Sequence, residues 1–149
     1  MPDHDHWMRR AIDLAYQCPQ AEGAFAVGAV IVVDDEEIAT GFSRETDAKV
    51  HAEEAALNKL SLDDPRLARA TIYSSLEPCS ERASKDRAPC TDRILAAGIP
   101  TVVIAWREPS TFVADCVGVE KLEQAGVTVI ELADLADAAM AMNRHLDLS

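Results

Sequence analysis

The sequence predicts an α/β protein, a three-layer α/β/α sandwich built around a mixed five-stranded sheet. The first observation is an apolar run at Ala26–Val33 that passes through an acidic turn into Ile38–Thr40, which is typical of an antiparallel hairpin. The second is that strand-like and helix-like segments alternate after this hairpin. Such alternation predicts parallel strands joined by right-handed crossovers, with helices on both faces of the sheet. Neither repeats nor linkers interrupt the pattern, and we expect residues 1–149 to form a single domain.

Five segments have the apolar spacing or the composition of helices, and most of them end at a recognisable stop signal. The first carries an apolar stripe and closes at Cys18-Pro19, and the second is rich in Ala, Glu and Leu and closes at Asp63-Asp64-Pro65. Gly98 and Gly126 end the third and the fourth. The predicted helices are Trp7–Gln17, His51–Leu60, Cys90–Ala97, Val117–Ala125 and Leu132–Leu146.

The later strands are predicted at the short apolar segments between these helices, Thr71–Leu76, Thr101–Trp106 and Val127–Ile130. Open α/β sheets bind ligands beyond the carboxyl ends of their strands. Cys79 follows the first of these strands and Trp106 ends the second. We therefore expect the functional site at this edge of the sheet.

The composition is that of a globular protein, with 48% apolar and 27% charged residues. No apolar run approaches the roughly 20 residues of a membrane span, so we expect no membrane association and a cytoplasmic location. Four cysteines in such a chain do not indicate a disulfide framework.

The net charge of −12 bears on the class of substrate. Proteins that bind nucleic acid normally present a basic face that neutralises phosphates. This chain offers only a short cluster, Arg82, Lys85 and Arg87, interrupted by Asp86. The charge therefore disfavours tRNA or DNA editing and favours a small neutral heterocycle as the substrate.

The triplet His51-Ala52-Glu53, followed by Pro78-Cys79 and Pro89-Cys90, predicts a hydrolytic zinc site. Imidazole and thiolate are ligands that zinc prefers, and a structural zinc site normally has four protein ligands. Three ligands, His51, Cys79 and Cys90, leave one position open for water, whose pKa zinc lowers to about 7. Glu53 would carry the proton from this water to the leaving nitrogen, whereas the neighbouring Glu54 is expected to be a solvated surface carboxylate.

At these residues the chain resembles the cytidine and deoxycytidylate deaminase superfamily, whose zinc ligands are one His and two Cys, with a non-ligand Glu for proton transfer. The familiar form has two residues between the cysteines, whereas residues 80–89 separate them here. The chain is most similar to the deaminase domain of riboflavin-biosynthesis enzymes, where a longer loop also ends in Pro-Cys, and to free-nucleobase deaminases. The resemblance extends from about Trp7 to Val129 and implies the sandwich fold described above.

The resemblance also implies where a substrate binds. Backbone N–H groups around Ala52 and Cys79 would bind its carbonyl, a carbonyl near Ser75 would accept from its amino group, and Ser43 matches a polar substrate-binding position. Relatives of this kind usually associate, so we expect a homodimer.

Aromatic side chains provide further candidates for the pocket. Phe25 precedes the first strand and is a candidate wall, while Trp106 and Phe112 either stack on the heterocycle or pack in the core or at a dimer interface.

The substrate prediction depends on how this chain differs from riboflavin-pathway deaminases. Riboflavin-pathway deaminases typically carry Asn-Pro shortly before a Val-Gly pair, whereas Ala24-Phe25 stand before Ala26-Val27-Gly28 here, and we expect no reductase domain to follow. We therefore expect a free nucleobase or analogue of the cytosine, guanine, azapyrimidine or amino-triazine type. The alternative substrate is the ribosylated diaminopyrimidine phosphate of riboflavin synthesis. A non-catalytic, zinc-stabilised binding module is an interpretation from another class.

Overall fold

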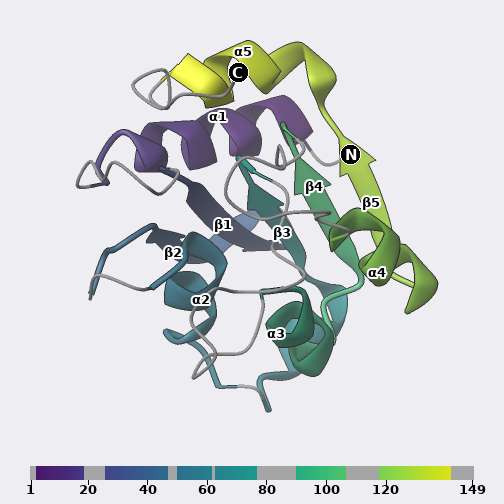
Figure 1. The fold of residues 1–149 in the computed structure, drawn as a ribbon. Coiled ribbons are helices and arrows are strands. Elements are labelled where there is room, and N and C mark those ends of the chain that lie inside the picture. The colour runs from purple at the N-terminus through teal and green to yellow at the C-terminus, as the bar shows by residue number, and fades with distance from the viewer. Residues whose placement is uncertain are drawn as a thin grey trace.

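The structure is a computed structural model that describes residues 3–18, 26–46, 50–61, 63–76, 90–106 and 118–141. Its strands are β1 (Gly28–Val33), β2 (Glu36–Phe42), β3 (Thr71–Ser74), β4 (Thr101–Ile104) and β5 (Thr128–Glu131). They form one five-stranded sheet in the order β2-β1-β3-β4-β5 (Figure 1). The α-helices are α1 (His4–Ala15), α2 (Ala52–Leu57), α3 (Cys90–Ala97), α4 (Gly118–Gln124) and α5 (Ala136–Ala141). Two 3₁₀ turns, η1 (Pro65–Arg69) and η2 (Ala133–Leu135), precede β3 and α5.

The strand directions explain why the sheet is mixed. β1 pairs antiparallel with β2 and with β3, while β3, β4 and β5 pair parallel. Because β2 and β3 each run opposite to β1, they share one direction although β1 lies between them. All strands after β1 therefore run the same way, which confirms the predicted fold class and the parallel arrangement inferred from alternation.

The hairpin between β1 and β2 turns at Asp34 and Asp35, whose φ angles are 52° and 63°. Two-residue hairpin loops favour positive φ at both central positions, and Asp tolerates that conformation better than most residues. The acidic turn inferred from the sequence is thus the turn that the structure contains.

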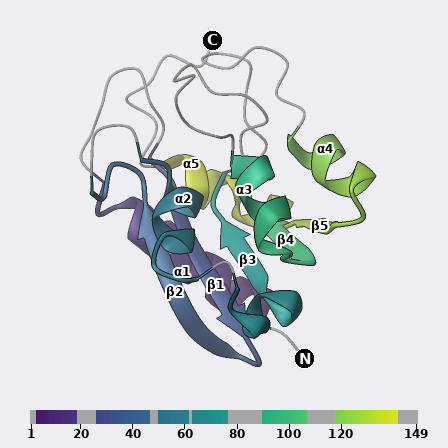
Figure 2. The same cartoon turned by 90° about the horizontal axis from the view of Figure 1, so that it is seen from below.

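The helices form two layers, one on each face of the sheet (Figures 1 and 2). α2, α3 and α4 cover one face, and α1 and α5 lie together on the other. Side chains of successive strand residues enter different cores, as the pleat requires. Ile31 and Ile72 belong to the core beneath α2, α3 and α4, whereas Val30 and Tyr73 belong to the core beneath α1 and α5.

Two glycines allow helices to approach the sheet closely. A Cβ at Gly41 of β2 would lie 2.4 Å from the Ala52 carbonyl oxygen, and a Cβ at Gly28 of β1 would lie 1.8 Å from the Ala11 carbonyl oxygen. Neither contact is possible for a larger residue, so these glycines set the heights of α2 and α1 above the sheet. The height of α2 matters for function because His51 immediately precedes this helix.

The element boundaries differ from the predicted ones by a few residues. α1 begins at His4, three residues earlier than predicted, because the Asp3 carboxylate caps it by accepting from the His6 N–H. The final helix begins later than predicted, since the chain passes through η2 before α5 starts at Ala136. None of the described helices has the length and apolar character needed to cross a membrane.

Candidate active site

Two of the three predicted zinc ligands meet between α2 and α3. The Cys90 sulfur lies 3.4 Å from Nδ1 of His51. His51 occupies the N-cap position of α2 in an extended conformation, and Cys90 is the first residue of α3. Cys90 is fully buried and His51 is half-buried. Two helix starts that are distant in sequence thus bring an imidazole and a thiol together.

This separation fits a shared zinc ion. With Zn–S and Zn–N bonds of about 2.3 and 2.0–2.1 Å, two ligands of a tetrahedral site lie about 3.6 Å apart. Nitrogen and sulfur are also the donor types that zinc prefers. The third predicted ligand, Cys79, lies outside the described residues, and within the described part of the chain no three metal-binding side chains come together.

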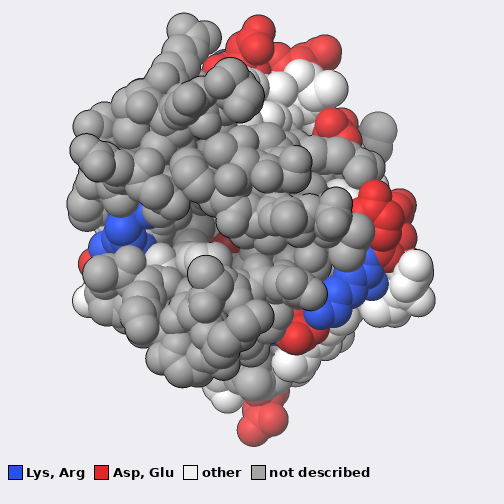
Figure 3. All heavy atoms as spheres, in the orientation of Figure 1, with Lys and Arg blue, Asp and Glu red and all other residues white. Residues whose placement is uncertain are grey.

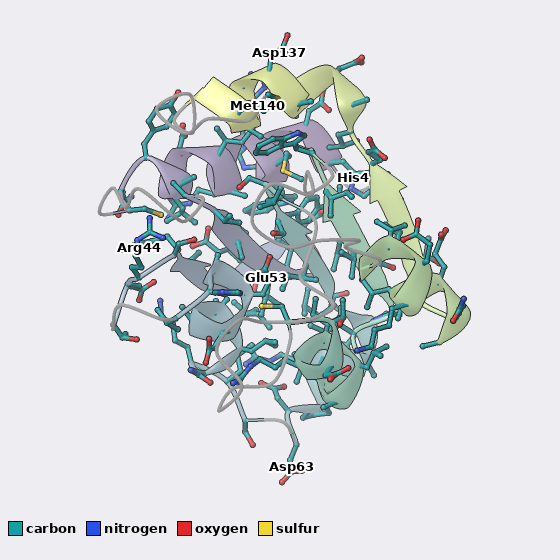
Figure 4. The ribbon with its side chains drawn as sticks, viewed as in Figure 1. His4, Arg44, Glu53, Asp63, Asp137 and Met140 are labelled. Carbon is teal, nitrogen blue, oxygen red and sulfur yellow. The ribbon has the colours of Figure 1, made fainter. Side chains whose placement is uncertain are left out.

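Glu53 is buried beside this pair, with 4% of its surface exposed. Figure 4 shows it near the middle of the molecule, over the sheet. Its carboxylate oxygen Oε1 forms a hydrogen bond with the hydroxyl of Ser74, the last residue of β3. The same hydroxyl lies 2.7 Å from the carbonyl oxygen of Leu76. Ser74 is fully buried, so both bonds are shielded from water.

The hydroxyl of Ser74 carries one proton but has two neighbouring acceptors. When Glu53 is ionised, the hydroxyl can donate to its carboxylate. When Glu53 carries a proton on Oε1, it can donate to Ser74, and Ser74 can then donate to the Leu76 carbonyl. The hydrogen-bonded chain therefore accommodates both protonation states of Glu53, which is what a residue that takes up and releases a proton requires.

Comparison with known sequences assigns the family. Residues 1–106 match the family described as the cytidine and deoxycytidylate deaminase zinc-binding region. The chain belongs to this family. A diaminohydroxyphosphoribosylamino-pyrimidine deaminase of Schizosaccharomyces pombe is 42% identical over 137 residues, which cover 91% of this chain and 33% of that protein. The chain thus spans about a third of the length of this relative.

Solved structures agree with this assignment. A diaminohydroxyphosphoribosylaminopyrimidine deaminase/5-amino-6-(5-phosphoribosylamino)uracil reductase of Thermotoga maritima superposes with a TM-score of 0.81 at 35% identity, covering 93% of this chain and 38% of that one. The Rib2 deaminase of Aspergillus oryzae in complex with DARIPP gives a TM-score of 0.73 at 25% identity, covering 86% and 84%. The predicted deaminase resemblance, its fold and its association with zinc are confirmed at the level of the family.

Glu54 is not the solvated carboxylate that the sequence suggested. It is 4% exposed, and its Oε1 accepts from the His51 N–H at 3.2 Å. Its Oε2 pairs with Nη2 of Arg93 on α3 at 3.0 Å. The prediction was wrong because α2 lies flat against β2 at Gly41 and turns toward α3, which buries both consecutive glutamates.

Sequence reasoning also missed Ser74 and Arg93. Ser74 is a polar residue at a buried position of an apolar strand, and it shares a sheet face with Ile72 two residues earlier. Arg93 follows Cys90 by three residues and so lies on the same side of α3. Each of these signals was present in the sequence, but their significance depends on where α2 packs.

Two predicted substrate-binding serines bond to the backbone at the start of β1. Ser43 Oγ accepts from the Val27 N–H at 3.0 Å, and Ser75 Oγ accepts from the Gly28 N–H at 3.1 Å. Cys18 joins this region, because its thiol lies 3.5 Å from the Val27 carbonyl, and burial raises its pKa. The two serines therefore hold the backbone of Val27 and Gly28, where β1 begins. Their contact with a substrate stays a prediction.

The other predicted pocket residues are only partly described. Ala52, the first residue of α2, is fully buried. Trp106 is half-buried and packs against both hydrophobic cores. Core packing was one of the predicted roles of Trp106, and stacking on a heterocycle stays a prediction. Phe25 and Phe112 lie outside the described residues.

Figure 3 shows the described charged side chains on one face of the molecule. On the face seen in Figure 3, the coloured acidic side chains lie around the edge and the basic ones form two small, separate groups. Several described cations pair with carboxylates, namely Arg10, Lys59, Arg66, Arg69, Arg93 and Lys121. Within the described part of this face, no continuous basic surface is seen.

Proposed function

We propose that this chain is a zinc-dependent hydrolytic deaminase that acts on the ribosylated diaminopyrimidine phosphate of riboflavin biosynthesis. The observation that carries the substrate is the 42% identity, over 91% of the chain, with the Schizosaccharomyces pombe deaminase named for that compound. The comparisons therefore favour the alternative over the free nucleobase. The expectation of a free base depended on the absent Asn-Pro pair and on the expected lack of a reductase domain, and both weigh less than identity that extends over 91% of the chain.

The zinc ligands in this proposal are His51, Cys90 and Cys79. The 3.4 Å separation of the first two supports it. In the sequence Cys79 comes five residues after Ser74, the last residue of β3, whose hydroxyl bonds to Glu53. A zinc ion held by these residues would lower the pKa of a coordinated water to about 7 and would supply a nucleophile at neutral pH.

Glu53 is the proposed acid and base. Its carboxylate takes one proton from the attacking water and passes it to the ring nitrogen. It then takes the second proton from the hydroxyl now on the ring carbon and passes it to the departing amine, so that the C–NH₂ group becomes C=O and ammonia leaves. Ser74 holds Oε1 of Glu53 through these steps, and whenever Glu53 is protonated the Leu76 carbonyl accepts the hydrogen bond that the Ser74 hydroxyl donates. The burial of Glu53 limits competing exchange with bulk water.

Substrate positioning is assigned to the residues that surround this edge of the sheet. We propose that the backbone at Ala52 and Ser75 binds the polar edge of the pyrimidine, and that the aromatic side chains of Phe25, Trp106 and Phe112 enclose its ring. Ser43 contributes by holding the start of β1. A homodimer is proposed as the form in which the pocket is complete.

The test is a deamination screen of the zinc-loaded protein. Ammonia release should be fastest with the ribosylated diaminopyrimidine phosphate and at least about 100-fold slower with cytosine, guanine and amino-triazines. Glu53→Ala serves as the control for contaminating deaminases. Turnover of a free base without turnover of the riboflavin intermediate would restore the other substrate class. Zinc binding without turnover of any heterocycle would support the non-catalytic module instead.

The phosphate of this substrate requires a cation in the pocket, and the basic cluster Arg82, Lys85 and Arg87 is the candidate. Arg87→Ala should raise KM for the phosphorylated substrate about tenfold and leave kcat nearly unchanged, because the phosphate is remote from the reacting carbon. The dephosphorylated nucleoside is the matched control, since its KM should not respond. Equal effects on both compounds would exclude phosphate binding by Arg87.

A further inference from the structure

Glu54 and Arg93 form an ion pair between the two helices that carry His51 and Cys90. Nη2 of Arg93 lies 3.0 Å from Oε2 of Glu54, and these side chains are 25% and 5% exposed. Glu54 lies in the first turn of α2, and Arg93 lies one turn after Cys90 on α3. The pair therefore joins the starts of the two helices, close to the residues that those starts present.

The second carboxylate oxygen of Glu54 reaches His51 directly. Oε1 accepts from the backbone N–H of His51 at 3.2 Å, as the third residue of a helix does in a capping box. One buried carboxylate thus contacts the backbone of His51 and, through Arg93, the turn that begins with Cys90. The same two segments carry His51 Nδ1 and Cys90 Sγ, which lie 3.4 Å apart.

We propose that Glu54 and Arg93 are positioning residues that set the separation of the His51 and Cys90 donor atoms, and thereby the zinc affinity of the site. This inference rests on the proposed zinc site. It assigns the pair no contact with substrate and no role in proton transfer.

Two physical arguments favour a geometric role over simple stabilisation. Capping does not require burial or a cation, because a solvated Glu or Gln caps a helix equally well. A buried ion pair is also weak support for stability, since desolvation offsets much of its attraction. What such a pair supplies is a fixed orientation between elements, and residues that orient metal ligands commonly change metal affinity 10–100-fold when they are replaced.

The chain offers substitutions that separate the ion pair from the cap. Glu54→Gln retains an oxygen that can accept from the His51 N–H but removes the charge that pairs with Arg93. Arg93→Met removes the guanidinium and keeps an unbranched side chain. Arg93→Lys keeps a cation that can pair with Glu54 and serves as the conservative variant. If Arg93→Met fails to fold, Glu54→Gln alone tests the loss of the ion pair.

Zinc affinity, measured by competition with a chromophoric chelator, is the primary readout, and the visible spectrum of the cobalt-substituted protein is the second. Glu54→Gln and Arg93→Met should each weaken zinc binding at least about tenfold and alter the cobalt absorption. Their double variant should bind no more weakly than the weaker single variant, because both remove one shared interaction. Arg93→Lys should retain most of the affinity.

The matched control is Asp92→Asn, which removes an ion pair from the same turn of α3. Asp92 pairs with Lys121 of α4 at 2.5 Å. Its loss should leave zinc affinity and the cobalt spectrum unchanged.

Unchanged zinc affinity in Glu54→Gln and Arg93→Met, with only a lower melting temperature, would overturn the proposal. So would effects that multiply in the double variant. A wild-type protein that binds no zinc would instead refute the proposed function itself.

Discussion

Two consecutive residues of β3 place a buried hydroxyl on opposite faces of the sheet. Tyr73 faces α1, where its Oη lies 2.7 Å from Nδ1 of His4. Ser74 faces α2, where its hydroxyl bonds to the Glu53 carboxylate. Each hydroxyl thus meets a titratable side chain carried by a helix, yet only the Ser74 side lies near the proposed zinc ligands.

The difference between the two pairs lies in their second partners. Ser74 has the Leu76 carbonyl at 2.7 Å as another acceptor, so the proton can be arranged in two ways without leaving a buried group unsatisfied. His4 and Tyr73 join a helix start to a strand, and their rings also lie in contact, with centroids 5.6 Å apart. The comparison teaches that a strand hydroxyl bonded to a helix anchors the fold on one face and, in the proposed mechanism, orients the proton carrier Glu53 on the other.

The largest effect is expected at Glu53. Glu53→Gln keeps the size of the side chain and a partner for Ser74 but removes the proton carrier, so kcat should fall by about 10²–10⁴-fold or more. Zinc content and melting temperature should equal or exceed those of the wild type, because buried charge at functional sites often costs stability. Steady-state ammonia release and metal analysis make the test. Turnover close to wild type would remove Glu53 from the mechanism.

Ser74→Ala should have the next largest effect. Without the hydroxyl, Oε1 of Glu53 loses the bond that fixes its orientation, and kcat should fall about tenfold with little change in zinc content. Ser74→Thr keeps the hydroxyl on a residue suited to a strand and should recover most of the activity. If Ser74→Ala and wild type turn over equally, the two faces of β3 do not differ in the way proposed.

Features that depend on local sequence could be predicted, whereas features that depend on packing could not. The hairpin turn at Asp34-Asp35 and the helix stops at Gly98 and Gly126 follow from local conformational rules, so the order of elements was predictable. The His51 and Cys90 pairing followed from ligand chemistry and spacing. These inferences need no knowledge of how distant elements pack.

Inferences that depend on packing were wrong or absent. Glu54 was predicted at the surface, and the sequence indicates no partner for His4. In the structure Glu54 pairs with Arg93 and His4 with Tyr73, both distant in sequence. Period and composition cannot reveal that α2 rests on Gly41 or that Asp3 starts α1 early enough to bring His4 over Tyr73. The roles of Ser74 and Arg93 depend on the same tertiary contacts.

On the other face, Tyr73→Phe should affect stability alone. Removing the hydroxyl leaves Nδ1 of His4 without this partner, and the free energy of unfolding should fall by about 1 kcal/mol. Urea denaturation measures this loss, and the m-value, the dependence of the free energy of unfolding on urea concentration, should stay unchanged. Activity should stay within about twofold of wild type, in contrast to Ser74→Ala next to it. A tenfold loss of kcat would mean that the α1 face also serves catalysis.

The last prediction concerns a pH dependence of stability that belongs to the same tyrosine and that appears only above about pH 10. Burial, with contributions from the charges of Asp35 and Asp3, raises the pKa of Tyr73 to about 12, whereas an unfolded tyrosine titrates near 10. Between these values the unfolded chain has released the proton that the folded protein still holds, so the free energy of unfolding falls as the pH rises. This contribution is complete below about pH 10 and is lost on approach to pH 12.

Tyr73→Phe lacks that contribution at every pH. The stability difference between wild type and Tyr73→Phe should therefore shrink from pH 9 to pH 12, as followed by urea unfolding at fixed ionic strength. Tyr16, the other tyrosine of the chain, is 60% exposed. The free energy of unfolding of Tyr16→Phe should therefore change with pH as that of the wild type does. Parallel curves for Tyr73→Phe as well would show that its hydroxyl is open to solvent, and the contrast between the two faces of β3 would then be lost.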